Sequence, residues 1–377
     1  MASRLRTALR DTRGAYDLTL VLAVLILLAV GVVMVYSASS VEAYATYGSS
    51  TYFLKRQLMW AVLGLGVMTV FSRIPYHQWM RWSIPLFGFT LLCLMLVLVP
   101  HIGIQVNGAR RWLGHGPLLF QPSELAKFSV TLLFGLTLTQ RQFEVSDLRR
   151  GFLPHLALLV VLFGLILKEP DLGTALSLGG TAVVMMTVAG ADWRHITSLG
   201  VLSLPTIGAL IAIEPYRVQR ILAFLDPFKD PLGSGYHTIQ GLMAIGSGGL
   251  LGSGLGRSAL KFFYLPEAHT DFIFAILAEE LGFVGAAAVV VLFFVVAWRG
   301  YRIALEAPDR YGAVLAVGLT TMVLLQAILN IGVVTDSLPV TGVPLPFISY
   351  GGSSLVFSLA GVGILLSISR ARIGQRS

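Results

Sequence analysis

Apolar stretches of about 20 residues recur along the whole chain, and they constrain its fold more than any other feature. A helix of that length crosses the hydrocarbon core of a bilayer, and an ordinary soluble domain has no use for so many. The sequence predicts an all-α polytopic membrane protein of about ten transmembrane helices. The predicted segments are residues 17–37, 57–73, 82–100, 124–140, 152–168, 172–190, 196–213, 271–298, 310–333 and 348–370.

The composition agrees with a lipid environment. Hydrophobic residues make up 55% of the 377 residues, charged residues only 12%, and the mean hydropathy is +0.79. A soluble domain carries roughly a quarter charged residues. The net charge of +8 is dispersed between apolar runs, which indicates membrane topology and anionic headgroups and excludes nucleic acid as a partner. The one cysteine, Cys93, leaves no disulfide or cysteine-based metal site within the chain.

The N-terminal apolar run could be mistaken for a signal peptide. Arginines precede it, and Ser37, Ala38 and Ser39 resemble a cleavage site. The run from Leu18 to Val35 is longer than the apolar region of a usual signal peptide, so we expect a retained first helix.

Lysine and arginine predict the orientation. If the N-terminus is cytoplasmic, 16 of the 27 basic residues fall in cytoplasmic segments, which favours both termini inside the cell. We therefore expect one membrane domain, 1–377, with cytoplasmic tails 1–16 and 371–377. A long extracytoplasmic loop, 214–270, would join helices seven and eight. Connections of this length inside a compact domain usually carry function.

Ionisable residues at membrane depth are costly and are therefore candidates for function. They gather toward the predicted outer side, as Glu124, Lys127, Lys168, Glu169, Asp171, Asp271, Glu279 and Glu280. Each has a structural alternative. Glu124 and Lys127 stand three residues apart and could simply neutralise each other on one helix face. The acids at 169 and 171 could decorate a turn, Asp271 could stabilise a helix start, and the acids at 279 and 280 could pair with buried partners.

Eleven basic residues fall on the predicted outer side, against the topological bias. They are Lys55, Arg56, Arg110, Arg111, Lys127, Lys168, Arg217, Arg220, Lys229, Arg257 and Lys261. Either they contact lipid headgroups or they bind an anionic substrate, since both side chains neutralise phosphate well.

Two glycine-rich runs interrupt the apolar pattern. Residues 246–256 lack the nucleotide-binding pattern of a P-loop, so they indicate a flexible loop or close backbone packing. Residues 341–354 lead into the last helix, and irregular backbone at that depth must be buried or line a groove. No firm metal-ligand spacing and no serine-nucleophile motif is present.

Several motifs together resemble one family, the SEDS proteins (shape, elongation, division and sporulation). They lie at residues 107–113, 121–127, 168–174, 235–240, 244–249, 265–282 and 344–354. Residues 223–228 and 261–271 are more similar to the FtsW and SpoVE members than to the RodA members.

The resemblance implies a peptidoglycan glycosyltransferase of the bacterial cytoplasmic membrane. It would polymerise lipid II, an undecaprenyl-pyrophosphate-linked disaccharide-peptide, into β-1,4 glycan strands by inverting displacement of the pyrophosphate. It also implies septal cell-wall synthesis during division, an active site facing the extracytoplasmic side, and a class B penicillin-binding protein as partner. Other divisome membrane proteins and membrane lipids complete the expected partners.

An inverting displacement needs a base and a group that stabilises the leaving charge. Asp271 matches the family's outer-face aspartate and is the expected catalytic base. The candidates to bind substrate are Arg110, Glu124, Lys127, Arg217, Lys261, Glu267 and His269, with Lys127 and Arg110 favoured for the pyrophosphate. A divalent cation, Mg²⁺ or Mn²⁺, could share that role, and the sequence does not assign its ligands.

Two other functions remain open at this point. A lipid II flippase would use the same substrate, but it needs polar residues through the full membrane depth. A non-enzymatic divisome scaffold would leave Asp271 and the outer positive charges without a role.

Overall fold

The computed structural model describes residues 15–106, 108–116, 118–140, 145–262 and 264–371. Most of both predicted tails lies outside this part of the chain, as do two residues of the motifs, Asn107 and Phe263.

Each of the ten predicted segments contains a helix. The ten are α2 (Leu18–Tyr47), α3 (Tyr52–Arg73), α4 (Gln78–Leu98), α5 (Pro122–Gln140), α6 (Leu153–Lys168), α7 (Leu172–Val188), α8 (Trp193–Ile213), α11 (Ile273–Leu305), α12 (Arg310–Val334) and α13 (Gly352–Ala371). A short π-helix, η1 (Leu148–Phe152), leads into α6, so the two together form one apolar span. The all-α membrane class is thus confirmed.

Eight of these helices are long and apolar enough to cross a membrane. The other two, α5 and α7, pack inside the bundle, where α5 is buried along most of its length. The structure therefore supports a polytopic fold, while the predicted side of each helix end stays a prediction.

Helix α2 extends ten residues beyond the predicted end of its span. The polar residues Ser37 and Ser39, which suggested that end, are buried within the helix. The Ser39 hydroxyl donates to the Val35 carbonyl at 2.6 Å, and Ser37 bonds to another helix. Because each hydroxyl has a partner, the helix continues through the polar residues.

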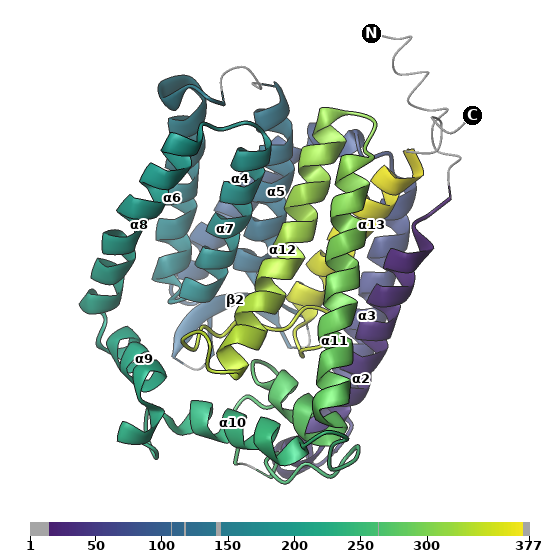
Figure 1. The fold of residues 1–377 in the computed structure, drawn as a ribbon, viewed down its shortest axis with the longest axis vertical. Coiled ribbons are helices and arrows are strands. Elements are labelled where there is room, and N and C mark those ends of the chain that lie inside the picture. The colour runs from purple at the N-terminus through teal and green to yellow at the C-terminus, as the bar shows by residue number, and fades with distance from the viewer. Residues whose placement is uncertain (1–14, 107, 117, 141–144, 263, 372–377) are drawn as a thin grey trace.

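The two ends of the described chain lie on the same face of the bundle. The backbone amide of Asp17 donates to the Ser369 hydroxyl at 3.3 Å. At the opposite end lie β2, α10 and the connection between α12 and α13 (Figure 1). We call this end the loop face.

Two side-chain interactions join α2 to α11. Near the start of α2, Asp17 accepts from the guanidinium of Arg299, with a closest approach of 2.6 Å. Twenty residues later, the Ser37 hydroxyl lies 2.6 and 2.7 Å from the two oxygens of Glu280. The helices are therefore fixed to each other near both ends.

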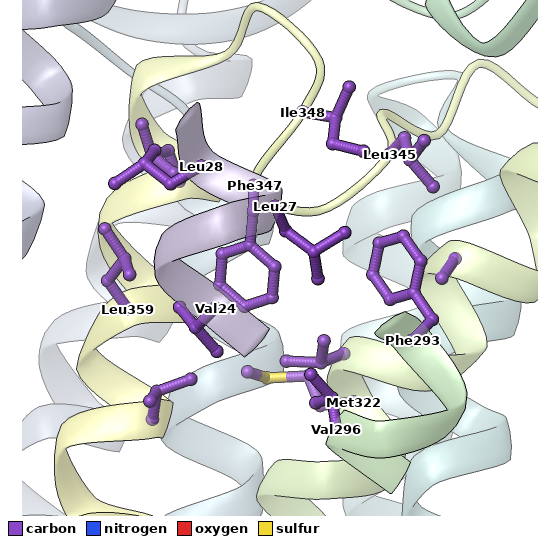
Figure 2. Close-up of a cluster of buried hydrophobic side chains, with 14 of the residues drawn as sticks. Val24, Leu27, Leu28, Phe293, Val296, Met322, Leu345, Phe347, Ile348 and Leu359 are labelled. Carbon is purple, nitrogen blue, oxygen red and sulfur yellow. The ribbon is translucent and has the colours of Figure 1, made fainter. Parts of the chain in front are cut away.

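The core lies where α2, α11, α12 and α13 meet the loop before α13. Leu27, Phe293, Met322 and Leu359 come from the four helices, and Phe347 from the loop (Figure 2). The irregular loop is thus buried in protein, as backbone at this depth requires.

A small antiparallel sheet on the loop face was not predicted. Its strands are β1 (Ile104–Val106), β2 (Ala109–His115) and β3 (Leu118–Phe120), in the order β1-β2-β3. Two of the strands have only three residues and β2 contains Gly114, so they leave little alternating pattern in the sequence.

The long segment 214–270 contains three helices, namely α9 (Pro215–Leu225), η2 (Pro227–Lys229) and α10 (Tyr236–Gly248). The glycine-rich run after α10 packs against a break in α11 at Gly282, where φ is +67°. Ser253 N donates to Glu279 O at 2.9 Å and Gly254 N to Glu280 O at 3.0 Å. Close backbone packing is therefore the role of this run.

Candidate active site

Asp271 lies on the loop face, two residues before α11 begins. Its backbone carbonyl accepts from the Asn330 side-chain amide on α12 at 2.8 Å. The same amide donates to the Val343 carbonyl at 2.8 Å. Because Asn330 is buried, its amide fixes the start of α11 against α12 and the loop that follows α12.

Four charged side chains act on the Asp271 carboxyl. Burial, followed by the negative charges of Glu267 and Asp171, raises its pKa to about 7. The positive charges of Arg111 and Arg220 act in the opposite direction. The carboxyl therefore titrates near neutral pH, where a general base works best.

Arg111 reaches the site from β2. Its Nε donates to the Glu169 carbonyl at 2.8 Å, and its Nη2 donates to the Pro170 carbonyl. These carbonyls form the turn between α6 and α7, which continues into Asp171. The small sheet thus carries one guanidinium to the acidic turn beside Asp271.

Asp171 does not simply occupy the turn, because its carboxylate makes two hydrogen bonds. One of its carboxylate oxygens caps α7 by accepting from Thr174 N at 3.0 Å. The other accepts from the Gln121 side chain at 3.2 Å, next to the start of α5. Asp171 therefore joins two helix starts while it contributes negative charge to the site.

Arg220 approaches from α9. Its Nη1 donates to the Val340 carbonyl at 3.1 Å, so the helix is tied to the loop between α12 and α13. Its guanidinium also lies 5.6 Å from the centre of the Tyr216 ring. Arg111 and Arg220 thus bring two positive charges to Asp271 from separate elements.

Glu124 and Lys127 form an ion pair on α5, which is the structural alternative expected for them. The ammonium lies 2.7 Å from the carboxylate, and both side chains are almost fully buried. Gln326 also donates to Glu124, at 3.5 Å. The described interactions join these residues to each other rather than to Asp271.

Lys261 and Arg217 are likewise bound within their own surroundings. Lys261 is buried and lies 3.5 Å from Glu280. Arg217, also buried, donates to the Leu210 carbonyl at 2.8 Å and to the Tyr216 hydroxyl at 3.0 Å. Neither cation is brought to Asp271 by a described contact.

Glu279 and Glu280 bind the segment around Ser258 and Ala259, which precedes Asp271 in the sequence. Glu279 accepts from the Ser258 hydroxyl at 2.5 Å and from Ala259 N at 2.8 Å. Glu280 accepts from Ser258 N at 3.3 Å and from Ser37. These contacts confirm the alternative in which the two acids pair with buried partners.

Glu267 and His269 lie just before Asp271 and differ in their neighbours. Glu267 accepts from the Thr270 hydroxyl at 2.7 Å, and its charge acts on Asp271. His269 is buried against the Phe53 ring, with its Nδ1 3.3 Å from a carboxylate oxygen of Glu42 on α2. Glu267 thus belongs to the charge cluster, while His269 anchors the segment to α2 and α3.

Arg110 and Arg111 are neighbours on β2 with different exposure. Arg110 is exposed, while Arg111 is partly buried against the α6–α7 turn. Successive side chains of a strand point to opposite faces, so only one of the two reaches the turn. The sequence analysis favoured Arg110 for binding the pyrophosphate. If strand β2 had been predicted, the alternation of its side chains would have shown that only one of the two arginines can face the site.

His237 on α10 was not singled out as a site residue. Burial and the charge of Arg220 lower its pKa, while Glu267 raises it. The net effect is a lowered pKa, so the imidazole is neutral at pH 7. It adds an uncharged donor or acceptor beside the charge cluster.

The carboxylates near Asp271 do not form a ready metal cluster. In the described ranges, no group of three or more His, Cys, Asp or Glu side chains is placed to hold a metal ion. The predicted Mg²⁺ or Mn²⁺ therefore gains no ligand set from the described residues and stays a prediction.

Comparison with known proteins places this geometry in context. Residues 18–373 match the family model FtsW/RodA/SpoVE, described as cell cycle protein. Stage V sporulation protein E of Bacillus subtilis is 48% identical over 94% of this chain and 97% of its own length. A probable peptidoglycan glycosyltransferase FtsW of Geobacter metallireducens is 45% identical over 94% of each chain.

Solved structures agree. A chain from a peptidoglycan synthase complex that coordinates polymerization and crosslinking is 34% identical, with a TM-score of 0.76 over 95% of this chain and 99% of that one. Rod shape determining protein RodA of Thermus thermophilus is 33% identical, with a TM-score of 0.69 over 95% and 98% of the two chains. This chain is therefore a membrane protein that belongs to the FtsW/RodA/SpoVE family, the SEDS proteins.

Proposed function

We propose that this protein is a peptidoglycan glycosyltransferase that polymerises lipid II. Relatives named as probable peptidoglycan glycosyltransferases, 45% and 44% identical over 94% of the chain, support the activity. The observation that carries the mechanism is Asp271, a buried carboxyl with a pKa of about 7 on which the charges of Arg111 and Arg220 act.

The reaction joins two lipid-linked sugars. The acceptor hydroxyl forms a bond to the anomeric carbon of the donor, and the bond from that carbon to the pyrophosphate oxygen breaks. The electron pair leaves with the pyrophosphate, and the hydroxyl proton passes to the carboxylate of Asp271. Because attack and departure occur on opposite sides of the carbon, an α-linked donor becomes a β-1,4 linkage.

The leaving pyrophosphate needs positive charge on the side of the donor carbon opposite to the base. Arg111 and Arg220 are the proposed source of this charge, because they are the cations that act electrostatically on Asp271 and so lie within reach of the same substrate. Guanidinium groups bind phosphate oxygens with paired hydrogen bonds, which suits this role. Lys127, Arg110, Arg217 and Lys261 remain weaker candidates, because none of them is among the charges that act on Asp271.

The remaining features follow from the same assignment. Lipid II would reach the loop face from the extracytoplasmic leaflet, which requires both termini in the cytoplasm. A class B penicillin-binding protein would crosslink the product, as suggested by the likeness to a complex for polymerization and crosslinking. Similarity to FtsW proteins supports the proposed septal role in cell division, and similarity to a stage V sporulation protein makes a sporulation role the alternative.

The test is glycan polymerisation from purified lipid II in the presence of the class B partner. Asp271→Asn keeps the size of the side chain but cannot accept the proton. We expect long glycan strands from the wild type and none from a folded, partner-bound Asp271→Asn. Normal polymerisation by this variant would remove Asp271 from the mechanism. An inactive wild type in the complex would favour a flippase or a scaffold.

A further inference from the structure

Helix α9 exposes large apolar side chains, which is unusual for a helix of an aqueous loop. Val218, Leu222 and Leu225 recur at helical spacing on one face, and the last two are 53% and 70% exposed. Arg217 and Arg220 occupy the other face. Arg217 is 8% exposed, and Arg220 donates to the Val340 carbonyl beside the site. Leu222 and Leu225 thus face outward, while Arg217 is buried against the protein and Arg220, although itself exposed, reaches the loop beside the site.

The outward face of α9 continues that of α8. None of the residues of α8 is buried, and Leu202, Leu204 and Ile213 are 65%, 71% and 71% exposed. A span with this surface lies in lipid on nearly all sides. Helix α9 begins two residues after α8 ends and lies directly below it (Figure 1).

The length of α9 limits how it meets the membrane. Its 11 residues rise about 16 Å, roughly half of the hydrocarbon thickness, so it cannot cross. Polar residues stand at both of its ends, Glu214 before it and Asp226 after it, and both are exposed. Apolar residues between polar ends, presented on one face, are typical of a helix in the interface between headgroups and acyl chains.

We infer that α9 is an interfacial helix, whose Leu222 and Leu225 contact the acyl chains of the leaflet at the loop face. The segment 214–270 is then only partly aqueous. Its first helix rests on lipid on one side and presents Arg220 to Asp271 on the other. The surrounding lipid thereby helps to hold a cation at the site, without contributing to the reaction.

Nitroxide labels would test this placement directly. Leu222→Cys and Leu225→Cys are made in a Cys93→Ser background, labelled, and reconstituted in vesicles of phosphatidylethanolamine and phosphatidylglycerol. Leu202→Cys on α8 is the lipid reference, and Ser234→Cys, in the exposed turn before α10, is the aqueous reference. Circular dichroism melting checks that each variant folds. The measurement is the accessibility of each label to oxygen and to a water-soluble nickel chelate.

We expect both α9 labels to match Leu202→Cys, with high oxygen and low nickel accessibility. Nickel accessibility as high as at Ser234→Cys would place α9 in water and overturn the inference. Low accessibility to both reagents would mean that protein, such as a second copy of the chain, covers this face, and would overturn it equally.

Discussion

Gly342 stands against the carboxylate of Asp271. A Cβ atom at residue 342 would lie 3.5 Å from Oδ2 of Asp271, and Gly342 itself adopts a φ of +77°. A side chain here would therefore meet the carboxylate and would also strain the backbone. The glycine keeps one side of the carboxylate clear for a reacting group.

Replacing this glycine should impair chemistry more than folding. Gly342→Ala costs about 1 kcal/mol for the left-handed backbone and also places a methyl group in van der Waals contact with the proposed base, where a reacting group would otherwise fit. We expect polymerisation to fall at least about tenfold, as 1.4 kcal/mol of lost transition-state stabilisation would give. Gly48→Ala is the matched control, because Gly48 has a φ of +68° and no atom within 4 Å of its Cβ position. Equal activity of the two variants would argue against a role for the clearance.

The pH profile of polymerisation should report Asp271. Since the carboxylate is the active form and its pKa is about 7, the rate should rise through neutral pH and then level off. The charge of Glu267 raises this pKa, so Glu267→Gln should move the rise to lower pH. Arg220 lowers it, so Arg220→Gln should move the rise to higher pH. A profile that neither variant shifts would assign the rise to another group.

Substitution of Arg220 should lower kcat/KM for lipid II more than substitution of Lys229, which lies on the same outer segment. Loss of a charge-assisted hydrogen bond costs about 1.5–3 kcal/mol, so Arg220→Gln should lower kcat/KM for lipid II about 10- to 100-fold. Lys229→Gln removes an exposed charge from η2 and should change it little. The comparison is made in steady-state assays with purified lipid II, and similar effects of both variants would indicate a non-specific loss of charge.

Glu169 should make the protein less stable as the pH rises. Burial, together with Asp171, raises its pKa from 4.5 to about 9, so the folded protein retains a proton that the unfolded chain loses. The free energy of unfolding should fall between these values, by at most about 1.4 kcal/mol per pH unit from this group. Glu169→Gln should remove that slope. Denaturation in detergent at several pH values measures it, and parallel curves for the two proteins would refute the assignment.

Glu280 should be among the acids on which stability depends most. It is buried and bonds to Ser37 and Lys261, and breaking a buried ion pair costs about 3–5 kcal/mol. Glu280→Gln should therefore strongly lower the melting temperature. The control is Glu306→Gln, which removes a surface pair with Arg302 and should cost about 0.5 kcal/mol or less. Comparable melting of both variants would show that the buried pair is dispensable.

The sequence predicted the membrane helices well because lipid imposes a long apolar run on each of them. It also pointed to Asp271 as the base. It was less informative about the cations, because the choice between Arg110 and Arg111 depends on a strand that leaves no clear pattern. Arg220 reaches the site through α9, and Lys127 is held by Glu124. Tertiary contacts decide which basic side chains lie near Asp271, and no local sequence pattern encodes these contacts.

The two interactions that join α2 to α11 also fix the number of residues between their partners on each helix. Asp17 and Ser37 are twenty residues apart on α2, and Glu280 and Arg299 are nineteen apart on α11. An inserted residue between Asp17 and Ser37, or in the helical part of α11 between Gly282 and Arg299, would turn one end of the helix by about 100° and shift it by about 1.5 Å, so only one interaction could survive. Exposed side chains along these two helices can therefore vary, but insertions and deletions between the paired residues should be excluded.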